Sequence, residues 1–147
     1  MPEILRSAIT TWTGDLKSGT GVTSGESGYL HDLKITWSSR FESNPGSNPE
    51  ELIAAAHASC FAMSISSNLT RQNTPPELIN AKATLTMRRD ESGTKLTKMH
   101  LEVEARVPGI DAAAFKAIAE KAKDTCPVSA LLKPGLEEIT LDAKLMA

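Results

Sequence analysis

The feature that most constrains the fold is a long apolar helix whose start is marked in the sequence. Asn48 is a favourable N-cap, Pro49 suits the first helical position, and Glu51 stands three residues after the cap. From Leu52 to about Arg71 the chain is rich in alanine and almost free of charge, so this helix is apolar on nearly every side. A helix of this kind is normally buried on most sides, and we expect it to be the central helix of the fold.

Segments with the composition or the alternation of strands lie on both sides of this helix: residues 4–12, 16–27, 33–37, 80–89, 94–107 and 137–146. A turn at Asp90 to Gly93 predicts that the fourth and fifth segments form a hairpin. A helix capped by Asp111 and a short helix opening at Cys126-Pro127 precede the last strand. This order predicts an α+β fold with antiparallel sheet, in a single domain covering residues 1–147.

Charge and composition argue against several classes of protein. The 16 Lys and Arg residues nearly balance the 18 Asp and Glu residues, so nothing favours binding to nucleic acid or to a membrane surface. The longest unbroken apolar run, Leu52 to Ala56, is far shorter than the roughly 20 residues of a membrane span. No secretion signal is visible, so we expect a cytoplasmic protein. His31, His57 and His100 are isolated from one another in sequence, and we expect no metal or other cofactor.

Cys60 and Cys126 are the residues most able to carry chemistry. Their spacing fits neither a CxxC motif nor a zinc framework, and a permanent disulfide is not expected in the cytoplasm. Cys60 lies twelve residues after the helix cap, beyond the reach of the helix dipole, so a reactive thiolate there requires a nearby cation. Cys126 stands at a predicted helix start, a setting that favours a thiolate. The alternative is two buried, inert thiols.

His57 precedes Cys60 by three residues on the same predicted helix. Residues three apart lie on neighbouring faces of a helix, so a Cys–His nucleophile pair is one interpretation. The other is a histidine that is hydrogen-bonded within the core, and the sequence leaves both open.

Several motifs together point to a family. Residues 48–61, NPEELIAAAHASCF, resemble the central-helix signature of the OsmC family, which contains the osmotically inducible protein C and organic hydroperoxide resistance proteins. Residues 125–129, TCPVS, resemble the second cysteine motif of that family. The motifs at residues 12–16, 19–21 and 39–42 resemble the OsmC subgroup more than its sister subgroup. The resemblance extends over essentially the whole chain.

The resemblance implies a thiol-dependent peroxidase that needs no metal, haem or flavin. Cys60 matches the peroxidatic cysteine, and Cys126 matches the resolving cysteine. Arg40 and Glu50 match the polar pair that holds the thiolate, with Arg6 as an alternative arginine. In this scheme Cys60 reduces a hydroperoxide, becomes a sulfenic acid and condenses with Cys126 to a disulfide, which an external dithiol, for example of the lipoyl type, then reduces.

The resemblance also implies an intertwined homodimer with two active sites at the subunit boundary. Glu50 and Cys60 are ten residues apart on one predicted helix, or about 15 Å along its axis, which a glutamate side chain does not span. Two antiparallel copies of this helix would bring Glu50 of one chain to Cys60 of the other. We therefore expect composite sites in an obligate dimer.

Apolar residues near the two cysteines predict a preference for organic hydroperoxides over hydrogen peroxide: Ala56, Phe61, Met63, Val128, Leu131 and Leu132. A different class of function remains open, namely a redox-switched binding or sensor module that uses the same cysteine pair. Repeated turnover distinguishes the two, because a sensor is oxidised once and stops.

Overall fold

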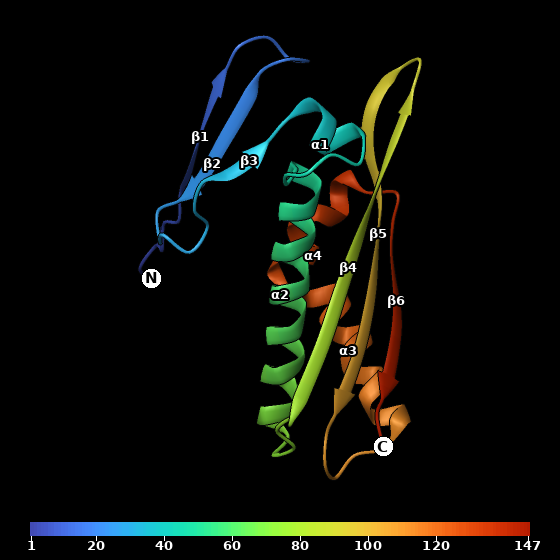
Figure 1. Ribbon diagram of the computed structural model, residues 1–147. Coiled ribbons are helices and arrows are strands. Elements are labelled where there is room, and N and C mark those ends of the chain that lie inside the picture. Colours follow the sequence, from blue (N-terminus) through green and yellow to red (C-terminus); the bar gives the residue numbers. More distant parts are fainter. The chain divides into compact units, whose positions relative to one another are not determined.

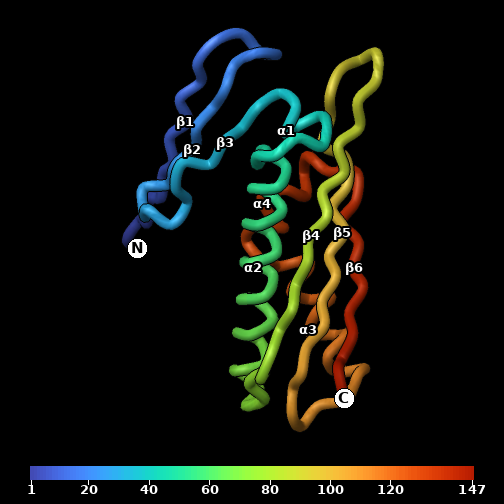
Figure 2. Tube along the Cα trace, viewed as in Figure 1, coloured from blue at the N-terminus to red at the C-terminus, as the bar shows by residue number.

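The computed structural model describes residues 1–147, and the chain divides into two compact units, residues 1–52 and 53–147. The central helix, α2 (Pro49–Arg71), begins in the first unit and continues through the second. Figures 1 and 2 follow the chain from the N-terminal strands to the last strand. The α+β fold expected from the sequence is confirmed.

The first unit is built on a three-stranded antiparallel sheet in the order β1-β2-β3 (Figure 1). Its strands are β1 (Ala8–Thr13), β2 (Thr20–Gly25) and β3 (Leu33–Ile35). Gly21 on β2 lies opposite Trp12 on β1, and a Cβ added there would come within 2.8 Å of the indole ring. Glycine at this position therefore lets the tryptophan pack against the strand.

A short helix, α1 (Trp37–Phe41), follows β3 and begins at residue 37, the last residue of the strand predicted from the sequence. The reason is a capping box. The Thr36 hydroxyl accepts from the Ser39 backbone N–H at 3.0 Å, and the Thr36 N–H donates to the Ser39 hydroxyl at 2.9 Å. These reciprocal bonds satisfy the backbone N–H groups of Thr36 and Ser39 at the helix start. The chain therefore leaves the strand conformation at Thr36, before the predicted end of the strand at residue 37.

The second unit places helices against one face of a second three-stranded sheet. Besides most of α2, its elements are β4 (Leu78–Asp90), β5 (Gly93–Arg106), α3 (Ala112–Thr125), α4 (Pro127–Leu132), the 3₁₀ helix η1 (Lys133–Gly135) and β6 (Glu138–Leu145). The sheet order is β4-β5-β6, with β4 and β5 joined as the expected hairpin. These strands run side by side in Figure 2.

One pairing differs from the antiparallel sheet that the sequence suggested, because β6 runs parallel to β5. Parallel neighbours need a long crossover connection, and α3, α4 and η1 provide it. The sheet is therefore mixed, and the crossover carries Cys126 at the junction between α3 and α4.

The core of the second unit lies between the sheet and its helices. Every second residue of β5 from Met99 to Ala105 is buried, and α2 and α3 contribute the opposing apolar side chains. In the part of α2 that belongs to the second unit, the buried positions form a single stripe: His57, Phe61, Ile65 and Leu69. The i, i+4 spacing of this stripe places it on one face of the helix.

The other residues of α2, apart from the buried Glu50, are half-buried or exposed within this chain, contrary to the expectation from its apolar sequence. Met63, for example, is 73% exposed. By length and composition alone, α2 is long and apolar enough to cross a membrane. The core helix of a soluble protein meets the same two criteria. Part of the apolar surface of α2 is thus left uncovered by the rest of the single chain, and we call this surface the unpartnered face of α2.

Candidate active site

Both cysteines belong to the second unit and both are reduced. Cys60 lies on α2 and is half-buried, whereas Cys126 is fully buried at the start of α4. Because Cys60 is the more accessible thiol, a dissolved oxidant meets it first, and Cys126 is reached only from within the protein.

The surroundings of Cys60 disfavour its thiolate. Burial is the largest influence and raises the pKa of the Cys60 thiol, although the backbone N–H of Val128 acts in the opposite direction. A hydrogen bond with the Cys126 thiol and the charge interaction with it raise this pKa further. The two thiols are therefore within interaction distance, and the single chain supplies no cation that lowers the pKa of Cys60.

Cys126 acts as the N-cap of α4, a role in which Ser, Thr, Asp or Asn is usual. Its sulfur accepts a hydrogen bond from the Ser129 backbone N–H at 3.3 Å, and Pro127 occupies the first helical position. The Cys126 thiol in turn donates to the Ser129 hydroxyl at 3.3 Å. This double contact with Ser129 fixes the direction of the buried thiol.

His57 resolves one question that the sequence left open. Its Nε2 lies 2.6 Å from the Ser129 hydroxyl, and the ring is fully buried, so it is a hydrogen-bonded core histidine. Burial lowers the pKa of His57 and keeps its imidazole neutral near pH 7. Sequence reasoning gave no role to Ser129, although a serine three residues after a Cys-Pro helix start is the position that can reach the cap.

Arg40 and Glu50 form an ion pair in the first unit. Arg40 donates from Nε to both Glu50 oxygens, at 3.0 and 3.3 Å, and from Nη2 to Oε1 at 2.7 Å. Glu50 lies in the first turn of α2, and its carboxylate is only 10% exposed. Such a forked pair holds the guanidinium in one orientation.

Arg6, the alternative arginine, is placed differently. It is exposed, and its guanidinium donates to the backbone carbonyl of Leu5 at 2.8 Å. The structure thus groups the four proposed site residues into two pairs, Arg40 with Glu50 in the first unit and Cys60 with Cys126 in the second.

One residue expected to line the substrate approach does not do so. Phe61 is fully buried in the core of the second unit, because it belongs to the stripe of α2 that faces the sheet. Met63 on α2 and Leu131 on α4 do remain exposed, the latter by 76%. No cluster of three His, Cys, Asp or Glu side chains is placed to hold a metal ion.

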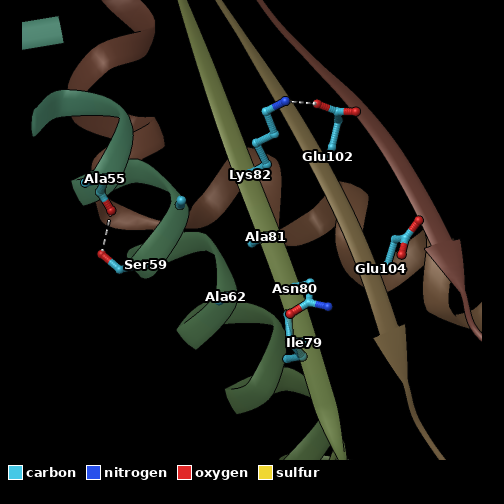
Figure 3. Close-up of a pocket in the computed structure, with 10 residues that line it drawn as sticks. Ala55, Ser59, Ala62, Ile79, Asn80, Ala81, Lys82, Glu102 and Glu104 are labelled. Atoms are coloured by element: carbon cyan, nitrogen blue, oxygen red, sulfur yellow. Dashed lines mark hydrogen bonds and ion pairs between the residues drawn. The ribbon is translucent and has the colours of Figure 1, made fainter. Parts of the chain in front are cut away.

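A groove of about 590 Å³ runs between α2 and β4 (Figure 3). Small side chains of α2 form one wall, and the outer strand of the sheet forms the other, with a Lys82–Glu102 ion pair of 3.9 Å across the neighbouring strands. Neither cysteine lines this groove. It therefore belongs to the unpartnered face of α2 rather than to the thiol pair.

Comparison with known proteins gives consistent matches. The family model described as "OsmC-like protein" matches residues 42–140. A protein of Escherichia coli (strain K12) named "Peroxiredoxin OsmC" is 46% identical over 134 residues, covering 91% of this chain and 92% of the relative, and a Shigella flexneri protein of the same name matches equally.

Solved structures show the same fold at low sequence identity. The organic hydroperoxide resistance protein OhrB of Bacillus subtilis aligns with a TM-score of 0.71 at 23% identity, over 93% of this chain and 97% of that one. An OsmC-like protein from Mycoplasma pneumoniae aligns with a TM-score of 0.76 at 11% identity, over 99% and 100% of the two chains. With the family model matching most of its length and a relative this similar, the chain belongs to the OsmC family.

Proposed function

We propose that this protein is a cysteine-based peroxidase that reduces organic hydroperoxides. The observation that carries the proposal is the pair of reduced thiols, one half-exposed and one buried, held next to each other in the second unit. The name of the Escherichia coli relative, a peroxiredoxin, supports the same activity. We further propose that both units act as one domain, in the cytoplasm.

The reaction begins at Cys60. Its thiolate attacks the distal oxygen of the hydroperoxide, the O–O bond breaks, and the alcohol leaves with a proton. Cys60 is then a sulfenic acid, and the Cys126 thiol condenses with it to form a disulfide and water. An external dithiol, for example of the lipoyl type, reduces the disulfide by exchange and completes the cycle.

Formation of the Cys60 thiolate requires a cation, since the surroundings of this thiol raise its pKa. We assign this role to Arg40, whose guanidinium Glu50 holds in a fixed orientation. A guanidinium at about 4 Å favours a thiolate by about 4 kcal/mol at an effective dielectric near 20. The same charge would favour the developing alkoxide of the peroxide.

We propose that this Arg40–Glu50 pair serves the Cys60 of a partner chain in a homodimer. Glu50 and Cys60 are ten residues apart on the continuous helix α2, which separates them by about 15 Å along its axis. A second copy of α2 packed antiparallel to the first would run in the opposite direction. The start of each helix would then lie beside a later turn of the other, which would bring each Glu50 toward the other chain's Cys60.

Exposed apolar surface supports the dimer. The face of α2 that includes Ala55, Ser59 and Ala62 lines the open groove and allows close approach of another helix (Figure 3). In the first unit, apolar side chains of the sheet and its loops are exposed, among them Ile9, Leu16 and Val22. Surfaces of this kind are normally covered by another chain.

Steady-state turnover tests the activity. The protein should consume cumene hydroperoxide repeatedly in the presence of dihydrolipoamide, with a higher kcat/KM than for hydrogen peroxide. Cys60→Ser should abolish consumption. Oxidation of one equivalent followed by arrest, with excess dithiol present, would favour the redox-switched module instead.

The composite site has its own test. The Glu50→Ala chain should be inactive because nothing then holds the Arg40 guanidinium in its orientation. Co-expression of Cys60→Ser with Glu50→Ala chains should restore activity to heterodimers, because one of their two sites combines an intact Cys60 with an intact partner Glu50. Homodimers of either variant are the matched controls. A fully active monomer in sedimentation velocity, or verified heterodimers without activity, would refute the arrangement.

A further inference from the structure

Three buried side chains in the second unit form a hydrogen-bonded chain that ends at the resolving cysteine. Cys126 donates to the Ser129 hydroxyl at 3.3 Å, and that hydroxyl lies 2.6 Å from His57 Nε2. All three residues are buried. His57 stands one turn before Cys60 on α2, and Ser129 stands one turn after Cys126, so the two helices connect the chain to both thiols.

The other ring nitrogen of His57 indicates that this histidine does more than pack. Nδ1 is buried and has no hydrogen-bond partner within the single chain. An unsatisfied buried polar atom costs about 1–3 kcal/mol, a cost that an apolar side chain in the same space avoids. When the Cys126 thiol donates to the Ser129 oxygen, the Ser129 hydroxyl directs its own proton to Nε2, so Nε2 accepts and the neutral ring carries its proton on Nδ1.

From this geometry we infer that Ser129 and His57 form a proton relay that deprotonates Cys126 as it attacks oxidised Cys60. Ser129 touches the reacting sulfur, and His57 acts through it as a positioning residue and proton acceptor. The inference rests on the proposed peroxidase function, since it concerns the step that closes the disulfide. Disulfide formation requires Cys126 to lose its proton, and the buried network would accept that proton.

The step balances without an outside oxidant. The Cys126 proton moves to the Ser129 oxygen while the Ser129 proton moves to His57 Nε2. The Cys126 sulfur then bonds to the Cys60 sulfur, and the S–O bond of the sulfenic acid breaks. The departing hydroxide takes up a proton from solvent at the half-buried Cys60 and leaves as water. The Cys126 sulfur is oxidised, the Cys60 sulfur is reduced, and the imidazolium returns its proton to solvent.

The protonation state of His57 suits this role. Burial lowers its pKa, and no charged side chain contributes to that shift. The titratable groups beside the relay are the two thiols, Cys60 from α2 and Cys126 at the start of α4. The imidazole is therefore neutral and able to accept a proton throughout the neutral pH range.

A rapid-mixing experiment tests the relay. Reduced protein is mixed with one equivalent of cumene hydroperoxide, quenched with an alkylating reagent and analysed by mass spectrometry for sulfenic acid and for disulfide. The variants are Ser129→Ala and His57→Gln, because glutamine keeps a polar contact but does not accept a proton. Thr125→Ala is the matched control: it removes a hydroxyl next to Cys126 that bonds only the Lys121 carbonyl.

The relay predicts two results. Oxidation of Cys60 should proceed at similar rates in all four proteins, which also reports an intact site in each variant. Disulfide formation should slow on the order of 100-fold in Ser129→Ala and His57→Gln, and remain unchanged in Thr125→Ala. The dimedone-trapped sulfenic acid should accumulate correspondingly.

The pH profile separates a relay from a merely structural contact. Disulfide formation in the unmodified protein should be nearly constant between about pH 6.5 and pH 8, whereas an unassisted thiol gains about tenfold per pH unit there. Ser129→Ala should show this steep rise. A steep rise in the unmodified protein, or identical rates and profiles in Ser129→Ala, would refute the relay and leave the peroxidase function intact. No Cys60–Cys126 disulfide in the unmodified protein would instead refute both.

Discussion

Replacing Arg40 by alanine should raise the pKa of Cys60 and slow its reaction with hydroperoxide. The pKa of this thiol is already raised by burial and by Cys126 within the single chain, so its thiolate depends on the proposed guanidinium of the partner chain. Arg40 carries its own counter-charge, because Glu50 accepts three hydrogen-bond contacts from it. The effect of the pair is consequently smaller than that of a lone arginine.

The size of the expected shift in the pKa of Cys60 depends on the charges of both Arg40 and Glu50. A guanidinium at about 4 Å from the sulfur contributes about 4 kcal/mol at an effective dielectric near 20, and a carboxylate about 3 Å farther away opposes it by about 2.4 kcal/mol. The Arg40 side chain is 36% exposed, and solvent screening reduces both values by about half. Removing the guanidinium alone then raises the pKa of Cys60 by about 1.5 units, whereas removing both charges raises it by about 0.6 units.

The pH dependence of iodoacetamide alkylation measures this pKa in a Cys126→Ser background, in which Cys60 is the one thiol. Arg40→Ala should shift the midpoint of alkylation upward by about 1.5 pH units. Arg40→Ala combined with Glu50→Gln should shift it upward by only about 0.6 pH units. An unchanged midpoint in Arg40→Ala would refute the assignment and make Arg6→Ala the next variant. Equal shifts in the single and double variants would show that the Glu50 charge does not reach the thiol.

Three further outcomes are expected. Cys126→Ser should complete one fast turnover and stop at a sulfenic acid that dimedone traps, while Cys60→Ser should consume no hydroperoxide; the reverse pattern would exchange the two roles. Phe61→Ala should lower the free energy of unfolding by about 3–5 kcal/mol in urea titrations, because it empties a fully buried site in the core. Dilution should lower the thermal midpoint, since dissociation of the proposed obligate dimer would expose the open face of α2.

Local chemistry made much of the fold predictable. The Asn48 side chain accepts from the Glu51 N–H at 2.7 Å, as expected of an N-cap, and α2 ends at Arg71 as the sequence indicated. Asp111 caps α3 in the same way, with its carboxylate accepting from the Ala114 N–H. In each case one side chain and a backbone N–H three residues later decide where the helix begins, so the signal is local in the sequence.

Features that depend on distant partners were not predictable. The parallel pairing of β5 and β6 depends on how the intervening helices return the chain to the sheet, which alternation within β6 does not encode. The contact between His57 and Ser129 joins residues 72 positions apart. Sequence placed each residue on its helix, but only the packing of α2 against α4 brings the imidazole to the hydroxyl.

In the proposed cycle, the unequal burial of the two thiols also determines how the oxidised protein is reduced again. In a Cys60–Cys126 disulfide, the Cys126 sulfur remains enclosed, so an external dithiol reaches the bond from the Cys60 side. Attack at Cys60 expels Cys126 as a thiolate, and exchange is faster when that leaving group is stabilised. The Ser129 N–H already points at the Cys126 sulfur at 3.3 Å, and the Ser129 hydroxyl is able to turn its proton toward it. In the proposed relay, the contacts that accept a proton from Cys126 during oxidation would thus return one to it during reduction, so the same buried network would serve both halves of the cycle.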